Sequence, residues 1–314
     1  MKLLITRCLP DAVVARAQTR FEVTYRHDLT PLTPRSLRDG LRDYDAILPT
    51  LGDFFRAEVF ADVAQPRAKL LANFGVGYNH IDVQAARAAG VAVTNTPGAV
   101  TAATADIALT LILMTARRAG EGERLVRSGL WSGWHPTQML GIDVTGRTVG
   151  IIGMGRIGKA IAHRCHYGFD MKILFHNRSL VDPGLPATQV ALSEVLKADI
   201  VVIAVPGGSA THHLISTAEF AQMRPDAILI NIARGDIVDE AALITALQTR
   251  QIAGAGLDVY EFEPKISPTL IAMQNVSLLP HLGTAVLKVR EAMGMMAVDN
   301  LFAHLDGQPL PNPV

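Results

Sequence analysis

The chain has 314 residues, of which 49 % are hydrophobic and 18 % charged, a composition typical of globular proteins that excludes a disordered chain. Its 29 basic and 29 acidic residues cancel, so no net charge favours nucleic acid or an anionic membrane as partner. Cys8 and Cys165 lack metal-type spacing, and no apolar run is long enough for a signal peptide or a bilayer span. We therefore expect a cytoplasmic protein without disulfides, bound neither to nucleic acid nor to a membrane.

Short apolar runs alternate with amphipathic stretches, which is the pattern of strands and helices in a parallel α/β sheet. The first part of the chain predicts a helix near residues 11–20 and a second helix ending at Gly90. Glycine suits that position because it adopts the left-handed conformation without a steric penalty. The expected strands of this part are 2–6, 46–49, 69–73 and 91–94.

A second α/β series begins after residue 96 with a strongly helical segment, 101–118, for which Thr101 is the candidate N-cap. The expected strands are 148–153, 172–175, 200–205, 227–232, 255–259 and 276–279, with helices at 158–168 and 285–305. The simplest division is into two α/β domains. One comprises residues 1–96 and 286–314, and the other comprises residues 97–285, including an apolar helix and an arm at 97–145.

A glycine-rich turn follows the strand predicted to begin at residue 148 and comes directly before a helix. It reads Gly153, Met, Gly155, Arg156, Ile157, Gly158, the spacing of dinucleotide-binding loops, and its flanking elements are those that the motif requires. Gly153 allows the tight turn, Gly155 lets the backbone approach a pyrophosphate, and Gly158 lets helix and strand pack closely. The backbone amides at the helix start would bind the phosphates. The sequence therefore predicts a Rossmann-type cofactor domain.

The choice of dinucleotide depends on the end of the next strand, where an NAD site normally carries an acidic residue for the ribose 2′-hydroxyl. Here the segment 172–179 contains no acid and ends in Asn177, Arg178 and Ser179. An arginine can hold a 2′-phosphate through charge-assisted hydrogen bonds. We therefore expect NADPH as the cofactor, with NADH bound more weakly. Alternatively, Arg178 is a solvated residue at a strand end and the cofactor is bound less selectively.

Four blocks in this order carry a resemblance to a known family: 153–158, 231–240, 253–264 and 279–284. The sequence resembles the D-isomer-specific 2-hydroxyacid dehydrogenases, and among them the glyoxylate/hydroxypyruvate reductases. The resemblance implies an α/β fold, in which a Rossmann-type doubly wound parallel sheet forms the cofactor domain and a flavodoxin-like α/β domain binds substrate. It further implies the reduction of a small 2-keto acid to a D-2-hydroxy acid.

By the same resemblance, Arg234, Glu263 and His281 form the catalytic set. A histidine suits proton donation to a carbonyl oxygen because its ordinary pKa is about 6.5. Glu263 would orient His281 and stabilise its protonated form, and Arg234 would clasp the substrate carboxylate at two points. Taken singly, such residues are more often a surface histidine, a turn arginine and a loop glutamate. Their shared order downstream of a dinucleotide loop favours catalysis.

The resemblance assigns further contacts to both domains. In the first domain, the backbone amides of Val76 and Gly77 would bind the substrate carboxylate, and Leu51 would contact the substrate. Asp258 would contact the nicotinamide carboxamide. The remaining cofactor contacts are assigned to Val205, Pro206, Ala233, His281 and Gly283. The pair Gly207-Gly208 departs from the bulkier turn of the relatives, and the sequence places this change at the adenosine end of the site.

Several features stay open at this level. The other nine histidines, including the pair His212-His213, show no metal-ligand spacing, so no metal is expected. The apolar helix and arm at 97–145 favour a homodimer, in which Trp131 and Trp134 close a pocket or lie in the dimer core. An alternative function on the same fold is a dinucleotide-sensing regulator or co-repressor. The physiological keto acid is not specified by the sequence.

Overall fold

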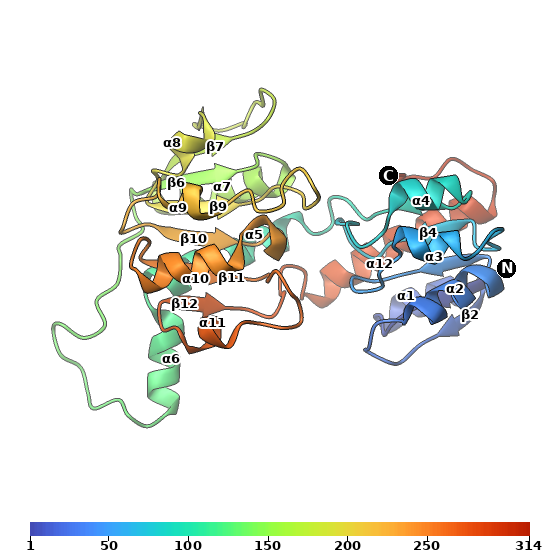
Figure 1. Ribbon diagram of the computed structural model, residues 1–314, viewed down its shortest axis with the longest axis horizontal. Helices are drawn as coiled ribbons and strands as arrows, with labels where there is room; N and C mark the ends of the chain where they lie inside the picture. Colours follow the sequence, from blue (N-terminus) through green and yellow to red (C-terminus); the bar gives the residue numbers. More distant parts are fainter. The chain divides into compact units, whose positions relative to one another are not determined.

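The computed structural model describes all residues from 1 to 314, and the chain forms two compact units. Unit 1 comprises Met1–Val100 and Ala285–Val314, and unit 2 comprises Thr101–Thr284 (Figure 1). The chain therefore leaves unit 1 after residue 100 and returns at residue 285. The boundaries expected from the sequence are 96/97 and 285/286.

Unit 1 is built on a five-stranded parallel sheet of order β2-β1-β3-β4-β5. This is the order of flavodoxin-like sheets. The elements are β1 (Lys2–Ile5), α1 (Asp11–Gln18), β2 (Glu22–Tyr25), α2 (Pro34–Asp43), β3 (Ala46–Leu48), α3 (Ala57–Ala61), β4 (Leu70–Ala72), α4 (Val83–Ala88), β5 (Ala92–Thr94) and α12 (Leu287–Leu305). The flavodoxin-like architecture predicted from the sequence is confirmed.

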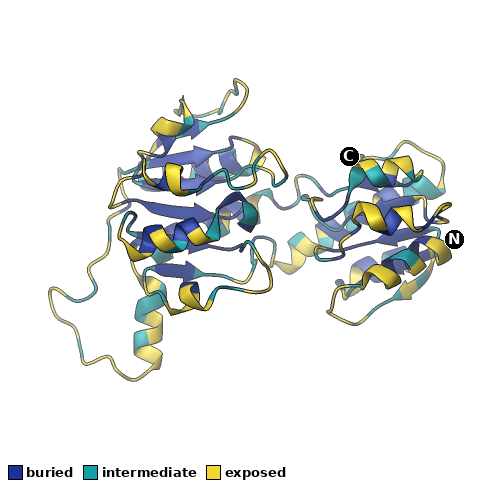
Figure 2. Cartoon of the chain, in the orientation of Figure 1, coloured by how far each residue is buried: buried dark blue, intermediate teal, exposed yellow.

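Both faces of this sheet are buried, as the dark strands of Figure 2 show. Alternate residues of β1 point to opposite faces, so Leu3 and Ile5 join one core and Leu4 joins the other. Helices α1 and α12 cover the first face, and α2, α3 and α4 cover the second. Gly294 lets α12 approach α1 closely, since a β-carbon there would lie 2.3 Å from Val13 Cγ2.

Unit 2 is built on a seven-stranded parallel sheet of order β12-β11-β10-β9-β6-β7-β8. With β6 as its first strand, this is the order of dinucleotide-binding sheets, extended at one edge by β12. The elements are α5 (Thr101–Ala116), α6 (Ala119–Arg127), β6 (Thr148–Ile152), α7 (Arg156–Phe169), β7 (Lys172–His176), β8 (Thr188–Gln189), α8 (Leu192–Val195), β9 (Ile200–Ile203), α9 (Thr217–Phe220), β10 (Ile228–Asn231), the 3₁₀ turn η1 (Gly235–Ile237), α10 (Glu240–Gln248), β11 (Gly254–Leu257), α11 (Pro268–Ala272) and β12 (Val276–Leu278). The Rossmann-type sheet predicted from the sequence is confirmed.

The two faces of the unit 2 sheet have separate cores. In β9, Ile200 and Val202 face the layer of α5 and α7, whereas Val201 and Ile203 face the layer of α8 to α11. Continuous apolar strands such as this one are typical of parallel sheets with both faces covered. Helices therefore cover both faces of the sheet, and the loops at the ends of its strands are left to carry a site.

Some expected boundaries are wrong. Thr101 is the first residue of α5 and not its N-cap. The helix expected to reach residue 118 ends at Ala116, because Arg118 adopts a left-handed conformation with φ of 53° before α6 begins. Helix α7 begins at Arg156, two residues before the expected start. The sequence also missed β2, an edge strand whose residues are only partly buried and therefore lack a clear apolar pattern.

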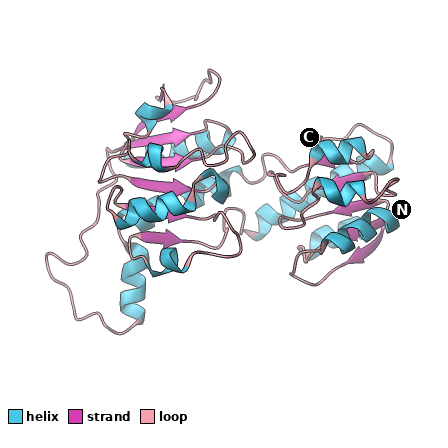
Figure 3. Ribbon diagram, in the orientation of Figure 1, coloured by secondary structure: helices cyan, strands magenta, loops and turns pink.

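Within unit 2, α6 and the long loop after it extend away from the sheet (Figures 1 and 3). Figure 2 shows this arm as mostly exposed. Its two tryptophans, Trp131 and Trp134, are 51 % and 79 % exposed. No helix of either unit combines the length and apolar character needed to span a bilayer.

Candidate active site

The residues assigned to the cofactor and to catalysis lie on the loops after six strands of unit 2. Because all of these strands are parallel, their carboxyl ends share one edge of the sheet. Strands β6 and β9 are neighbours there, and the chain runs in opposite directions across the sheet on either side of them. Ligands of open α/β sheets bind outside the carboxyl edge at such a switch point.

The glycine loop has the local geometry that a dinucleotide needs. Gly153 has a φ of +101°, which glycine tolerates and other residues rarely adopt. A β-carbon on Gly158 would lie 2.1 Å from the carbonyl oxygen of Gly153, so only glycine lets the loop and α7 pack this closely. A β-carbon on Gly155 would meet no atom within 4 Å, and no side chain caps α7. The loop thus offers open space and free helix amides to a phosphate group.

The end of β7 lies beside this loop. Asn177 Oδ1 accepts a hydrogen bond from the backbone N–H of Met154 at 3.4 Å, and its Nδ2 donates to the carbonyl oxygen of Ser179 at 3.2 Å. Asn177 therefore shapes the turn after β7 and ties it to the glycine loop. Arg178, at the tip of this turn, is exposed and makes no hydrogen bond or ion pair within the protein.

His281 and Glu263 form a direct pair. The Nδ1 atom of His281 lies 2.9 Å from Glu263 Oε2, and each side chain is 32 % exposed. The other carboxylate oxygen of Glu263 accepts the backbone N–H of Tyr260 at 2.9 Å. Burial favours a higher pKa for Glu263, but its hydrogen bond to His281 and the histidine charge outweigh burial and lower this pKa. Glu263 is therefore an ionised partner that orients the imidazole and leaves Nε2 outside the pair.

Asp258 holds the turn that carries His281. This side chain is 1 % exposed; its Oδ1 accepts the N–H of Leu282 at 2.6 Å, and its Oδ2 accepts the N–H of Gly283 at 2.8 Å. His281 itself has a φ of +56°, a left-handed conformation that costs energy in a non-glycine residue. Burial raises the pKa of Asp258, and its backbone bonds oppose this effect. Asp258 thus fixes the strained turn, a role that the sequence did not suggest.

Arg234 follows β10 and is held by its surroundings. Its Nη1 donates to the carbonyl oxygen of Ala233 at 2.7 Å, and Asn231 Nδ2 donates to the Arg234 carbonyl oxygen at 2.8 Å. Desolvation lowers the pKa of Arg234, whereas the carboxylates of Glu263 and Asp236 raise it. An arginine nevertheless stays charged at neutral pH, so this site presents a fixed cation.

The glycine pair after β9 lies beside Arg234. A β-carbon on Gly207 would lie 2.7 Å from Arg234 Cγ. The missing side chain therefore makes room for the stem of Arg234, and the expected change at the adenosine end stays a prediction. Val205, earlier in the same loop, lies against the glycine loop, because its Cγ1 is 2.8 Å from the position of a β-carbon on Gly153.

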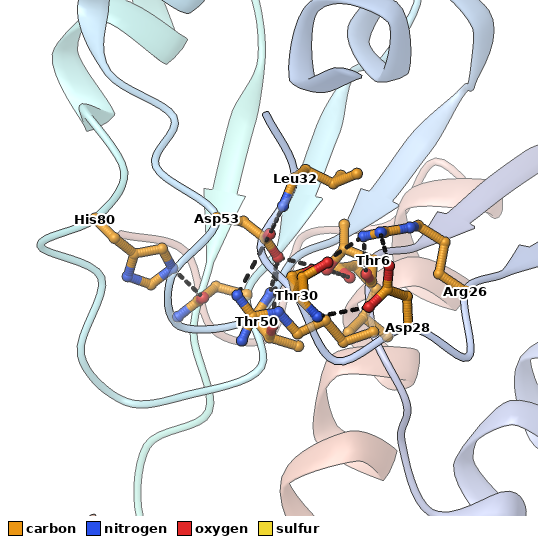
Figure 4. Close-up of polar contacts among 11 residues, drawn as sticks. Thr6, Arg26, Asp28, Thr30, Leu32, Thr50, Asp53 and His80 are labelled. Carbon is orange, nitrogen blue, oxygen red and sulfur yellow. Dashed lines mark hydrogen bonds and ion pairs between the residues drawn. The ribbon is translucent and has the colours of Figure 1, made fainter. Parts of the chain in front are cut away.

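In unit 1, the loop after β4 presents Val76 and Gly77. Buried Asn73 holds this loop, since its Nδ2 donates to the carbonyl oxygens of Gly75 at 3.0 Å and Gly77 at 3.1 Å. Its Oδ1 pairs with His80 Nε2 at 3.0 Å, and the ring of His80 points into this contact in Figure 4. With the carbonyls turned toward Asn73, the N–H groups of Val76 and Gly77 find no acceptor in the protein.

Leu51 lies in the neighbouring turn after β3, which Asp53 organises. Asp53 is fully buried, and Figure 4 shows it among four donor groups: Thr6 Oγ1 at 2.6 Å, the N–H of Leu32 at 3.0 Å, and the N–H and Oγ1 of Thr50 at 3.1 Å and 3.3 Å. A buried carboxylate needs such partners to offset its desolvation. The network joins the ends of β1 and β3 and leaves Leu51 37 % exposed.

The structure thus gathers Arg234, Asp258, Glu263 and His281 at one edge of unit 2, and it places Leu51, Val76 and Gly77 on loops of unit 1. The sequence missed the residues that hold these groups, namely Asn73, Asp53, Asn231 and the backbone of Tyr260. Asn73 and Asn231 stand at or just after the end of a buried apolar strand. That position is a signal by which both could have been found.

Comparison with known proteins identifies the family. Residues 109–283 match the family described as D-isomer specific 2-hydroxyacid dehydrogenase, NAD binding domain. The chain is 44 % identical over 321 aligned positions to a glyoxylate reductase of Thermococcus onnurineus, covering all of this chain and 95 % of the relative. Among solved structures, an NADPH-dependent glyoxylate/hydroxypyruvate reductase of Sinorhizobium meliloti, in complex with NADP and malonate, matches with a TM-score of 0.89 and 35 % identity, covering 100 % of this chain and 96 % of the other.

A glyoxylate reductase from Paecilomyes thermophila also matches, with a TM-score of 0.89 and 31 % identity, covering 100 % of this chain and 98 % of the other. These matches extend over both units, and the matched NAD-binding region lies within unit 2, which carries the glycine loop and the His281–Glu263 pair. The chain belongs to the family of D-isomer-specific 2-hydroxyacid dehydrogenases.

Proposed function

We propose that this protein reduces small 2-keto acids, glyoxylate and hydroxypyruvate among them, to D-2-hydroxy acids, with NADPH as the preferred hydride donor. The observation that carries the proposal is the His281–Glu263 pair, held by Asp258 at the carboxyl edge of a dinucleotide-binding sheet. The names of the relatives, glyoxylate reductase and glyoxylate/hydroxypyruvate reductase, support this substrate class.

The residues of the glycine loop fit a dinucleotide, since Gly155 leaves open space and the start of α7 is uncapped. When bound, the nicotinamide supplies a hydride for the keto carbon. His281 then gives the proton from Nε2 to the carbonyl oxygen, and Glu263 stabilises the protonated imidazole through Nδ1. A proton and a hydride together convert the keto group to an alcohol, so the step balances without a metal.

Arg234 binds the substrate carboxylate in this scheme. A guanidinium makes two parallel hydrogen bonds to a carboxylate, which orients the keto group as well as binding it. We assign to the N–H groups of Val76 and Gly77 a further contact with the carboxylate, and to Leu51 a contact with the substrate side chain. The absence of protein acceptors for those N–H groups supports the assignment.

Arg178 selects NADPH over NADH in this proposal, because it is exposed, unpaired and close to the turn that Asn177 ties to the glycine loop. A charge-assisted contact contributes about 1.5–3 kcal/mol, which is roughly one to two decades of affinity. Arg178→Ala should therefore weaken NADPH by about that factor and NADH much less. Arg250→Ala is the matched control, because Arg250 is also exposed but precedes β11 at the opposite edge of the sheet. Equal weakening of both cofactors would contradict the assignment of Arg178.

The direct test of the function follows NADPH oxidation with glyoxylate and hydroxypyruvate, for the wild type and for His281→Ala. We expect turnover by the wild type, and a variant that binds NADPH normally but has lost at least two decades of kcat, the usual contribution of general acid catalysis. Cofactor binding without turnover of any keto acid by the wild type would instead indicate a dinucleotide-sensing regulator. Near-normal turnover by the variant would refute the role of His281.

We further propose that two copies associate through the arm. The arm exposes three large apolar side chains that a second copy would cover in this proposal: Trp131, Trp134 and Leu140, which are 51 %, 79 % and 67 % exposed. The apolar helix α5 lies at the base of this arm and continues into α6. A two-fold contact through the same segment in both copies would close the assembly as a dimer.

A further inference from the structure

A cluster outside the proposed catalytic set joins two histidines and a glutamate. His212 and His213 lie on the loop after β9, and Glu261 lies on the segment after β11. One possible ligand atom from each of the three residues lies within 4.8 Å of the other two. The imidazole rings are stacked with centroids 3.9 Å apart, and His213 Nε2 is 2.8 Å from Glu261 Oε1.

The backbone holds two of these three side chains in place. The N–H of His213 donates to the carbonyl oxygen of Asp236 at 2.8 Å, and His213 has a left-handed φ of 50°. The second carboxylate oxygen of Glu261 accepts the N–H of Glu240, at the start of α10, at 3.0 Å. The two groups are thus preorganised by separate segments. Preorganisation of this kind reduces the ordering cost of binding a ligand.

The exposure of the three side chains increases from Glu261 to His213 to His212, so an ion could enter from the side of His212. The Glu261 side chain is 13 % exposed and that of His213 is 34 % exposed, while His212 is exposed to solvent. An ion would therefore meet a mostly buried carboxylate, a half-buried imidazole and an exposed imidazole. Its remaining coordination positions would face water.

We propose that His212, His213 and Glu261 form a binding site for a divalent transition-metal ion of the Zn²⁺ class. Two imidazole nitrogens and one carboxylate oxygen are a donor set that Zn²⁺ binds tetrahedrally with one water, whereas Mg²⁺ and Ca²⁺ prefer oxygen ligands alone. Zinc–ligand bonds are about 2.0–2.2 Å long, which puts the ligand atoms of a tetrahedral site about 3.4 Å apart. His213 Nε2 and Glu261 Oε1, now 2.8 Å apart, must therefore separate slightly, while the His212 nitrogen moves toward them. The exposed ring of His212 can make this movement by rotating off the stack.

The competing explanation is a plain structural contact, in which Glu261 orients His213 and caps α10 while His212 is solvated. A structural contact predicts no stoichiometric metal binding, and it predicts no role for His212, because this side chain makes no hydrogen bond in the protein. The two explanations therefore differ most sharply at His212. Occupancy would restrain the segment that carries Glu263, since Glu261 lies only two residues before it.

The test uses the full-length, tag-free protein stripped of metal by a chelator and titrated with Co²⁺, followed by competition with Zn²⁺. We expect one Co²⁺ per chain with visible d–d absorption, displaced by Zn²⁺. His212→Ala should weaken Co²⁺ binding roughly tenfold or more. Loss of a residue that only hydrogen-bonds to a metal ligand already lowers metal affinity about 10–100-fold, and His212 is itself a proposed ligand. His135→Ala, which removes an exposed histidine on the arm, should leave binding unchanged.

Glu261→Gln provides a second variant, since the amide oxygen can still accept the N–H of Glu240 and so preserve the start of α10. We expect this variant to unfold at the wild-type temperature without metal, and to lose most of the rise in unfolding temperature that Zn²⁺ gives the wild type. The proposal is overturned if wild-type protein binds less than stoichiometric Co²⁺, or if His212→Ala and Glu261→Gln bind it as the wild type does.

Discussion

Three glycines on or beside α7 should respond differently to the same change, replacement by alanine. A β-carbon at position 158 would lie 2.1 Å from the Gly153 carbonyl oxygen, far inside van der Waals contact, whereas β-carbons at 155 and 168 would meet nothing within 4 Å. Gly158 and Gly168 lie inside the helix, and Gly155 is its N-cap. Position 158 therefore tests backbone crowding, position 168 tests helix propensity, and position 155 tests contact with a ligand.

The magnitudes follow from these positions. Overpacking typically destabilises a protein by about 1–3 kcal/mol. A backbone carbonyl cannot rotate away as a side chain can, so the loss of stability in Gly158→Ala should reach or exceed the upper end of this range. Gly168→Ala should stabilise the protein by about 0.5–1 kcal/mol, the helix-propensity difference between the two residues. Gly155→Ala should cost at most about 1 kcal/mol, because alanine is a poorer N-cap than glycine. Its added methyl group would stand where a pyrophosphate approaches, so NADPH affinity should fall about tenfold or more.

Thermal unfolding measures the first two effects, and fluorescence titration with NADPH measures the third. Gly168→Ala is the control for any general effect of alanine on α7, because it is expected to raise the unfolding temperature and to bind NADPH normally. The reasoning fails if Gly158→Ala is as stable as Gly168→Ala. It also fails if Gly155→Ala binds NADPH with wild-type affinity, since Gly155 would then face no part of the cofactor.

Three further predictions use other parts of the molecule. The pKa of Glu263 lies below its ordinary value of 4.5, so the carboxylate contributes stability that is present at neutral pH and lost as the pH falls through the lowered pKa. Glu263→Gln should therefore unfold at a lower temperature than the wild type at neutral pH and approach it in acid, and thermal unfolding across this pH range measures the difference. Burial raises the pKa of Cys165 to about 12, so this thiol should not react in the native protein. A disulfide reagent should therefore titrate one thiol per native chain, that of the exposed Cys8, and two after denaturation. Two rapidly reacting thiols in the native protein would contradict the burial of Cys165. Light scattering should give twice the 33.7 kDa chain mass, and Trp134→Ser should weaken association; a wild-type monomer at micromolar concentration would exclude the dimer.

The sequence alone indicated the buried strands of both sheets and the glycine loop, because these features depend on local chemistry, but it missed the edge strands β2 and β8. Apolar runs such as 200–205 identify buried parallel strands. The spacing of Gly153, Gly155 and Gly158 reflects the tight turn between a strand and the helix that directly follows it, so a short segment is enough to recognise it. Local reasoning was weakest where burial is partial. The edge strand β2 and the break at Arg118 depend on what packs beside them, which the pattern of a single segment does not contain.

Tertiary structure decided which polar groups meet. Asp258 accepts the backbone N–H groups of the turn after His281, Gly207 makes room for Arg234, and Glu261 lies beside His213 although 48 positions separate them. None of these contacts has a sequence signal, because each joins loops that follow different strands of one parallel sheet. The strand order β9-β10-β11-β12 and the shared carboxyl edge bring these loops together, and that order is set by packing across the whole domain. The sequence therefore predicted the residues that we propose for acid catalysis, whereas the groups that orient them appeared only in the folded chain.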